Sequence, residues 1–66
     1  MPDTFGERLK AIRKSQGLKQ YKLAEKIGIY TSQLSKFERG LTVPNVTTLE
    51  WICKALDVSA TELLGW

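Results

Sequence analysis

The fold is decided by residues 20–39, which read QYKLAEKIGIYTSQLSKFER. Apolar residues recur in this stretch at three- and four-residue intervals, which place their side chains on one face of an α-helix. The pattern predicts two short helices, over residues 20–27 and 31–38, joined by a turn centred on Gly28. The residues expected to face inward are Leu23, Ile27, Ile29, Leu34 and Phe37.

Two small residues determine how these helices can meet. Ala24 lies where the helices are expected to cross, and a larger side chain there would hold them apart. Gly28 can adopt the positive φ that a tight turn between nearly perpendicular helices requires. Together with the five apolar positions, these two residues give the spacing of a helix-turn-helix motif.

A capping box predicts a helix ahead of the motif. In Thr4-x-x-Glu7, each side chain can satisfy a free backbone N–H of the other residue. The apolar residues that follow share one helical face: Phe5, Leu9 and Ile12. The helix is expected to end at Gly17, and we interpret the glycines at 6, 17, 28 and 40 as stops between short helices.

Two more helices are expected after the motif. Asn45 is the predicted N-cap of the fourth helix, and Ser59-x-x-Glu62 is a second capping box that opens a fifth, carrying Leu63 and Leu64. The inner face of the fourth helix is predicted to comprise Val46, Leu49, Ile52, Cys53 and Leu56, with Cys53 a small buried apolar residue. No stretch alternates apolar and polar residues as a half-buried strand does. The sequence therefore predicts an all-α fold of five short helices around one core.

The length and composition of the chain limit the functions that it can perform. Sixty-six residues suffice for one small domain, so residues 1–66 are interpreted as a single domain. The chain has no histidine and one cysteine, which excludes an internal disulfide and removes the commonest general base and metal ligand. No glycine-rich phosphate loop is present. We therefore expect neither an enzyme nor a bound cofactor, metal or small-molecule ligand.

Basic side chains are concentrated around the motif. The net charge is only +3, yet residues 8–39 hold nine lysines and arginines against two glutamates. Residues 40–66 hold one lysine against three acidic residues. This asymmetry favours a polyanionic partner on the motif face, although a well-solvated lysine-rich surface would give the same count.

Several short segments form a pattern known from one family. They are Leu18-Lys19-Gln20, Leu23-Ala24, Ile27-Gly28, Leu34-Ser35-x-Phe37-Glu38-Arg39-Gly40, Pro44-Asn45, Leu49 and Ala55-Leu56-x-Val58-Ser59. Together they resemble the phage repressor and Cro-type family, also called XRE-type, over roughly residues 5–64. The resemblance implies a compact five-helix, lambda-repressor-like DNA-binding domain with its helix-turn-helix at residues 20–39. It also implies a sequence-specific transcriptional regulator, in the first instance a repressor, that binds an inverted-repeat operator in double-stranded DNA as a homodimer.

The family's docking geometry implies which residues contact bases. The second helix of the motif lies in the major groove, which here places residues 31–39 against the base edges. The implied base contacts are Thr31, Ser32, Gln33, Ser35 and Lys36. Lys36 can donate to guanine O6 and N7. Thr31 and Ser32 could instead serve only as helix caps.

A second set of residues is expected to contact the DNA backbone: Lys19, Gln20, Tyr21, Lys22, Tyr30, Arg39 and Thr42. Gln20 matches the family's backbone-positioning glutamine and could also brace Thr31 or Ser32. Lys19 and Lys22 oppose the macrodipole at a helix start, a cost that a bound phosphate would offset; an unoptimised surface is the alternative. The following loop, Leu41-Thr42-Val43, lacks the basic residue that members often carry.

The remaining assignments concern rigidity and assembly. Arg13 and Glu38 occupy positions that pair in the family, which implies an ion pair that fixes the recognition helix. Trp51 and Trp66 fall outside the core pattern and, with Val58, are assigned to a homodimer contact through the last two helices. Alternatively, the two tryptophans could cover each other or the end of the first helix.

One rival function stays open. A protein-interaction adaptor could keep the helix-turn-helix fold without binding specific DNA, although such an adaptor would not need the basic motif half. Because no secretory signal, apolar span or disulfide pair is evident, the expected location is the cytoplasm, in association with the nucleoid and not with a membrane.

Overall fold

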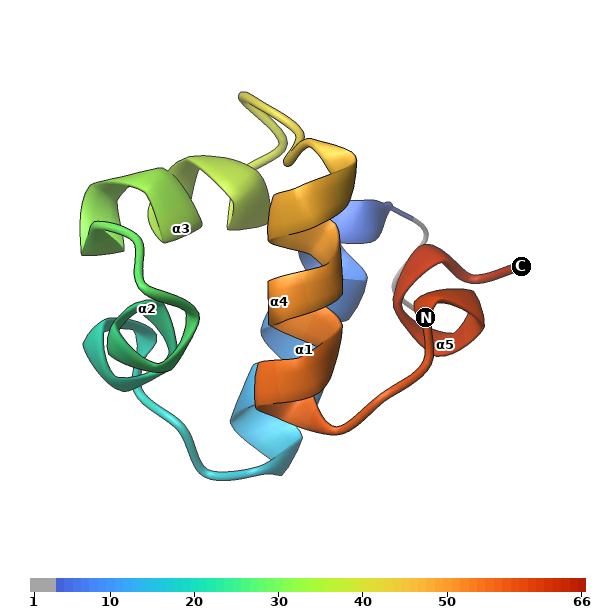
Figure 1. Cartoon of the computed structure of the whole chain (residues 1–66), viewed down its shortest axis with the longest axis horizontal. Helices are drawn as coiled ribbons and strands as arrows, with labels where there is room; N and C mark the ends of the chain where they lie inside the picture. The colour runs from blue at the N-terminus through green and yellow to red at the C-terminus, as the bar shows by residue number, and fades with distance from the viewer. Residues whose placement is uncertain (1–3) are drawn as a thin grey trace.

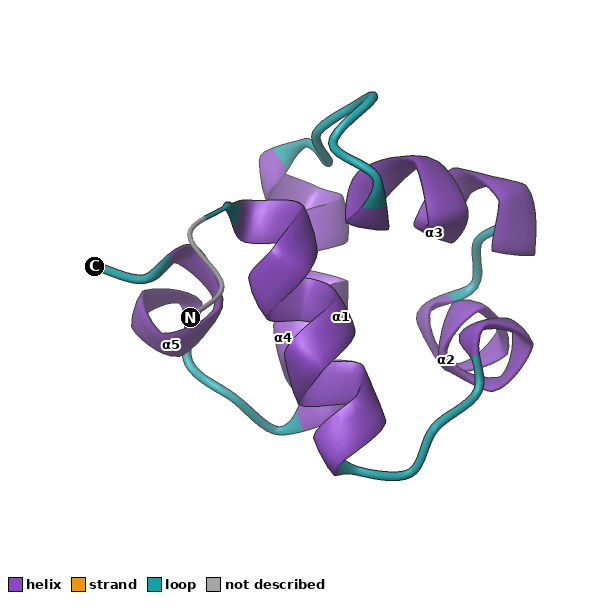
Figure 2. Ribbon diagram, turned by 180° about the vertical axis from the view of Figure 1, so that it is seen from behind, coloured by secondary structure: helices purple, strands orange, loops and turns teal. Residues whose placement is uncertain are grey.

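The computed structural model describes residues 4–66, which form five α-helices (Figure 1). The helices are α1 (Phe5–Ser15), α2 (Gln20–Ile27), α3 (Thr31–Glu38), α4 (Val46–Leu56) and α5 (Ala60–Leu64). In Figures 1 and 2, α2 and α3 lie to one side of α1 and α4, and α5 lies to the other. The predicted all-α, five-helix fold is confirmed. Within the described residues, no helix is long and apolar enough to cross a bilayer.

One hydrophobic core holds these short helices together. Every helix contributes at least one buried apolar side chain, and six side chains are completely enclosed: Leu9, Leu23, Leu34, Ile52, Leu56 and Leu63. Helices of five to eleven residues are marginal in water on their own. The stability of each element therefore comes from tertiary packing, with α1 against α3 and α5, and α4 against α2 and α5.

The corner between α2 and α3 has the predicted construction. Ala24 is almost completely buried on α2, and Gly28 ends α2 with a φ of 90°. The N–H groups of Gly28 and Ile29 both donate to the Ala24 carbonyl oxygen, which satisfies the end of α2 within the turn. Ile29 is only half-buried, so four of the five predicted apolar positions form the enclosed part of this corner.

The predicted helix starts are confirmed, with one change in detail. The side chains of Thr4, Asn45 and Ser59 each accept a backbone N–H three residues ahead. The Glu7 carboxylate, however, accepts from the Thr4 hydroxyl at 3.0 Å and not from the Thr4 backbone. The first capping box is therefore closed through side chains.

Three predictions about α1 and α4 are wrong. Gly6 is not a stop but a buried residue in the first turn of α1. Val46 does not face the core: as the first residue of α4 it is 73% exposed. Cys53 is half-buried, not enclosed. The C-cap that follows α4 is Asp57, which adopts a left-handed φ of 55° that aspartate tolerates better than most residues.

Candidate nucleic-acid interface

The outer face of α3 carries the residues predicted to contact bases. Thr31, Ser32, Gln33 and Lys36 are exposed, and Ser35 is half-buried. The opposite face of α3 supplies Leu34 and Phe37 to the core. The helix is thus anchored by one side while its polar side faces outward.

The N-cap of α3 is Tyr30, not Thr31 or Ser32. The Tyr30 side chain makes no capping bond and is 79% exposed. Instead, the Tyr30 backbone N–H donates to Gln33 Oε1 at 2.9 Å. Within residues 4–66, the hydroxyls of Thr31 and Ser32 make no hydrogen bond, so the interpretation of these two residues as mere caps is wrong.

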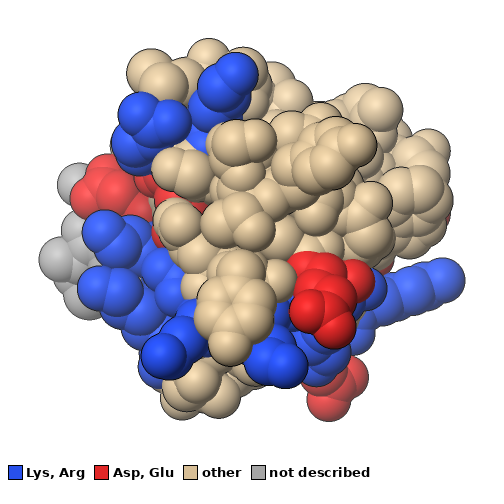
Figure 3. All heavy atoms as spheres, turned by 90° about the vertical axis from the view of Figure 1, so that its left-hand side faces the viewer, with Lys and Arg blue, Asp and Glu red and all other residues tan. Residues whose placement is uncertain are grey.

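The start of α2 presents positive charge next to α3. Lys19 is the N-cap of α2 without a side-chain capping bond, and no acidic residue lies in the first turn. Lys22 places its ammonium 5.7 Å from the centroid of the Tyr21 ring, and both side chains are exposed. Figure 3, which views the side of the molecule formed by α2 and α3, shows lysines and arginines along its left and lower parts beside an uncharged centre, with some acidic side chains among them.

A buried polar cluster fixes α3 to the two preceding helices. Arg13 donates from Nε to Glu38 Oε2 at 2.7 Å and from Nη2 to Glu38 Oε1 at 3.1 Å, so the structure contains the expected ion pair. Arg13 Nη1 also donates to the Leu18 carbonyl oxygen at 2.7 Å. Gln20 Nε2 donates to Glu38 Oε1 at 3.0 Å. The Glu38 carboxylate therefore joins α1, α2 and α3 at one point.

This cluster corrects one expectation for Gln20. Its amide braces Glu38 at the end of α3, whereas a brace to Thr31 or Ser32 at the start was expected. The reason is geometric, because Gln20 opens α2 beside the C-terminal end of α3. Among the described residues no buried side-chain nitrogen or oxygen lacks a hydrogen-bond partner, so the cluster can be rigid without an unsatisfied group.

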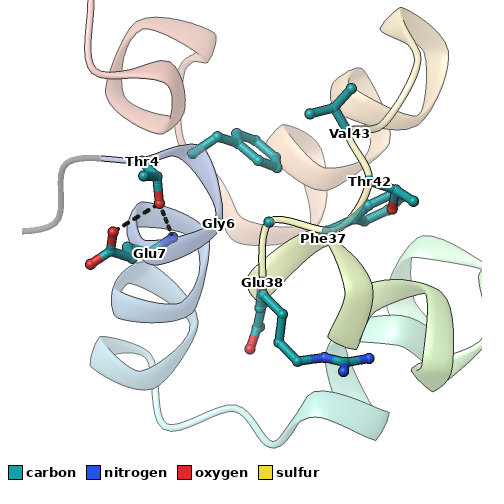
Figure 4. Close-up of a pocket in the computed structure, with 10 residues that line it drawn as sticks. Thr4, Gly6, Glu7, Phe37, Glu38, Thr42 and Val43 are labelled. Atoms are coloured by element: carbon teal, nitrogen blue, oxygen red, sulfur yellow. Dashed lines mark hydrogen bonds between the residues drawn. The ribbon is translucent and has the colours of Figure 1, made fainter.

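The loop after α3 forms one wall of a pocket against the start of α1 (Figure 4). Thr42 and Val43 line the pocket together with Phe5 and Phe37. Leu41 and Val43 are largely exposed. Arg39, the last basic residue before this loop, lies back along α3 with its Nε 3.4 Å from the Ser35 carbonyl oxygen.

Two residues that matter to the structure were missed by sequence reasoning. Arg8 donates from Nε and Nη2 to the carbonyl oxygens of Leu63 and Leu64 and so satisfies the end of α5. Gln16 donates from Nε2 to the Leu56 carbonyl oxygen at 2.6 Å, at the end of α4. Arg8 therefore has a structural role and is not simply part of a basic surface. Neither contact has a local signal, since the partners lie 40 to 56 positions apart.

The two tryptophans lie in different places. Trp51 is half-exposed and borders a groove with Lys26, Gly28 and Lys54, on the side of α4 that faces α2. Trp66 is 87% exposed beyond α5, at the C-terminal end on the other side of the molecule (Figure 1). The tryptophans do not cover each other. Val58, assigned with them to an interface, packs partly against the core.

The last two helices instead carry a shallow apolar surface, which we call the α4–α5 strip. It comprises Val46, Leu49, Cys53 and Ala60, with Glu50 and Lys54 at its border. Burial, and then the Glu50 carboxylate, raise the pKa of the Cys53 thiol above its ordinary value. Cys53 is therefore a neutral, apolar part of the strip and a weak nucleophile. No cluster of metal-ligating side chains occurs within residues 4–66.

Comparison with known proteins agrees with this geometry. A helix-turn-helix family model matches residues 9–63. The immunity repressor of Bacillus phage phi105 is 40% identical over 62 residues, covering 94% of this chain and 43% of that protein. The regulator SinR of Bacillus subtilis is 45% identical over 61 residues, covering 91% of this chain and 55% of that protein. The chain thus spans about half the length of these curated relatives.

A solved structure extends the likeness to three dimensions. The P22 c2 repressor, crystallised with a synthetic operator, matches the present structure with a TM-score of 0.89 and 35% sequence identity over 94% of both chains. Fold, motif spacing and family model coincide over the same residues. The chain therefore belongs to the helix-turn-helix family of phage repressors and Cro-type regulators that its sequence resembles.

Proposed function

We propose that this protein is a sequence-specific regulator of transcription that places α3 in the major groove of double-stranded DNA. The observation that carries the proposal is the outer face of α3, where polar side chains are exposed on a helix that Glu38 holds rigidly to α1 and α2. A helix held in this way can present several side chains to base edges in one fixed arrangement. The similar P22 c2 repressor was crystallised with an operator.

The two helices of the motif contact different parts of the DNA. Thr31, Ser32 and Lys36 of α3 contact base edges, because they lie on its outer face. Lys19, Tyr21 and Lys22 contact phosphates, because the uncompensated start of α2 offers free N–H groups and positive charge together. Tyr30, Arg39 and Thr42 extend these backbone contacts on the two flanks of α3.

A single α3 reads few base pairs, so we propose that the protein acts as a homodimer on an inverted repeat, with repression as its effect. The proposed contact is the α4–α5 strip, and the exposed Trp66 follows α5 at the C-terminal end. Glu50 and Lys54 at the border of the strip are self-complementary, because a two-fold axis sets each Glu50 against the partner's Lys54. Trp51 lies outside this contact, beside α2. Such a regulator works at the nucleoid, in the cytoplasm.

Salt-dependent binding to random duplex DNA tests the proposal against a protein-interaction adaptor. Each phosphate contact lowers the slope of log affinity against log salt by about 0.9, so an interface of several lysines gives a steep, linear decline. Fluorescence anisotropy with a labelled duplex measures this slope between low and physiological salt. An adaptor that only keeps the fold would show no binding even at low salt, and this result would refute the proposal.

A further inference from the structure

The Gln33 carboxamide already makes one hydrogen bond before DNA arrives, through its oxygen. The first N–H groups of a helix have no partner within the helix, and the Tyr30 N–H is bound instead by Gln33 Oε1 at 2.9 Å. A backbone N–H can only donate, so the atom that faces it must be the amide oxygen and not the amide nitrogen. The orientation of the Gln33 carboxamide is therefore fixed by chemistry. Its nitrogen makes no hydrogen bond within residues 4–66.

We infer that Gln33 reads DNA as a hydrogen-bond donor only and selects guanine, not adenine. The inference rests on the proposed placement of α3 in the major groove. A glutamine that recognises adenine does so with both edges of its carboxamide, accepting from N6 and donating to N7. Here Oε1 is held by the Tyr30 N–H, which leaves both N–H groups of the carboxamide, but not a freely oriented oxygen, for the base edge. The two remaining N–H groups match guanine, which presents O6 and N7 as adjacent acceptors.

If the Gln33 carboxamide turned over, the N-terminus of α3 would lose the hydrogen bond that caps it. If Oε1 turned toward adenine N6, the Tyr30 N–H would lose its acceptor at the buried DNA interface, and an unpaired donor there opposes binding. Lys36 strengthens the same preference. It lies three residues further along α3, on a neighbouring position of the same helix face, and its ammonium can only donate. The outer face of α3 thus presents donors at two neighbouring positions, and we expect guanines at neighbouring base pairs.

The test compares the wild type with two substitutions that separate capping from base reading. Gln33→Glu keeps an oxygen to accept the Tyr30 N–H but exchanges the donor for an acceptor. Gln33→Ala removes both functions. Sites are selected from a random duplex pool with each protein, and the base pair that depends on residue 33 is the one whose preference differs among the three selections.

The inference predicts guanine at that position for the wild type, cytosine for Gln33→Glu and no preference for Gln33→Ala. Cytosine follows because its N4 amino group is the donor that a carboxylate requires. In the selected wild-type site, replacing this guanine by 7-deazaguanine removes the N7 acceptor and should weaken wild-type binding about fivefold to tenfold, with no effect on Gln33→Ala. Inosine keeps N7 and O6 and is the matched control, which should leave affinity unchanged.

Hydrogen exchange of the Tyr30 amide reports directly on the hydrogen bond to Gln33 that caps α3. The Tyr30 amide should exchange slowly in the wild type and in Gln33→Glu, and faster in Gln33→Ala, both free and bound to DNA. The measurement on the free protein needs no knowledge of the operator, and the measurement on the complex detects a side chain that turns away on binding.

Three results would overturn the inference. They are adenine at the position that depends on residue 33, identical selected sites for the wild type and Gln33→Glu, or fast exchange of the Tyr30 amide in the wild-type complex. A wild type that enriches no sequence at all would refute the proposed function instead. The two failures are therefore distinguishable.

Discussion

Gly6 shows how one missing side chain sets the position of the recognition helix. A Cβ at this position would lie 2.5 Å from the Phe37 carbonyl oxygen and 2.6 Å from that of Glu38. Both oxygens belong to the end of α3, so α1 and α3 can approach this closely only because residue 6 is glycine. The glycine is required for a close approach within a helix and not for a turn.

Gly6→Ala should therefore destabilise the protein, although alanine is the better helix former. Helix propensity alone predicts a gain of about 1 kcal/mol in the free energy of unfolding. Overpacking against backbone atoms that cannot yield should instead produce a loss of about 1–3 kcal/mol. Urea unfolding measures the difference, and Ala11→Gly at an exposed position of α1 calibrates the propensity effect in the same helix. A more stable Gly6→Ala variant would show that the contact is not tight.

Two lysines of the motif should differ in what they contribute to DNA binding. Lys36→Ala should cost about 1–3 kcal/mol on the preferred site and relax the choice at one base pair, because we propose that its ammonium contacts a base edge. Lys22→Ala should weaken binding to preferred and random DNA equally and reduce the salt slope by about 1, because we propose that Lys22 contacts phosphate. Titrations with both duplexes measure these effects. A uniform loss for Lys36→Ala would make Lys36 a phosphate contact.

At the scale of elements, α1 acts as the frame for the other helices. Polar side chains of α1 and of its C-cap, Gln16, satisfy groups on three other elements: Arg8 binds the end of α5, Gln16 the end of α4, and Arg13 the Glu38 carboxylate of α3. These contacts connect the helix ends, where backbone carbonyls lack partners within the helix. The orientation of α3 therefore depends on residues that do not themselves face the proposed DNA surface.

Glu38→Gln should lower the free energy of unfolding by about 3 kcal/mol. The substitution keeps the shape of the side chain but leaves the buried Arg13 guanidinium without its counter-charge. Glu25→Gln, at an exposed position of α2, is the matched control and should change stability by less than about 0.5 kcal/mol. Thermal and urea unfolding compare the two variants. Equal effects would mean that the ion pair does not stabilise the fold.

Features that depend on residues close together in the sequence could be predicted, whereas contacts between residues far apart in the sequence could not. The caps at Thr4, Asn45 and Ser59 and the turn at Gly28 are local, because each depends on residues a few positions apart. Helix bounds and the motif were therefore predictable. The close approach at Gly6 and the bonds of Arg8 and Gln16 depend on where distant helices pass, which no local pattern contains.

The exposed position of Val46 could not be predicted for a related reason. Helical periodicity shows which residues share a face of the helix, but not how far along the helix that face is covered. In α4 the first turn lies outside the core, and the buried residues come later in the helix. The separation of Trp51 from Trp66 likewise depends on the packing of α4 between α2 and α5.

At the scale of the whole molecule, the proposed functions occupy different surfaces. The basic face of α2 and α3 lies on one side of α1 and α4, and α5 lies on the other side (Figures 1 and 3). The α4–α5 strip is formed by other helices than the motif, so a second copy can bind there without covering α2 or α3. Two copies joined in this way would bring two recognition helices to one duplex.

Val46→Glu should convert the proposed homodimer to a monomer without unfolding the chain. The side chain is 73% exposed, so the charge meets water in the monomer but apolar surface in the dimer. A monomer loses the effective concentration of the second half-site, so affinity for a full site should fall by about two to four powers of ten while affinity for one half-site stays constant.

Sedimentation measures the mass, and circular dichroism checks the fold. Val43→Glu changes a similarly exposed valine in the preceding loop; it is the matched control and should stay dimeric. Dissociation of the dimer by Val43→Glu would show that the dimer contact lies at the loop, and dissociation by Trp51→Ala would show that it lies at the groove beside α2. Either result would contradict the proposed strip.

Selection of bound sites from a random duplex pool with the unmodified protein tests the central claim most directly. If α3 reads base edges and the chain dimerises, the enriched sites should form an inverted repeat with half-sites about 10 base pairs apart, centre to centre. A pool that stays random through repeated rounds, or one enriched only in single half-sites each bound by one chain, would contradict this account.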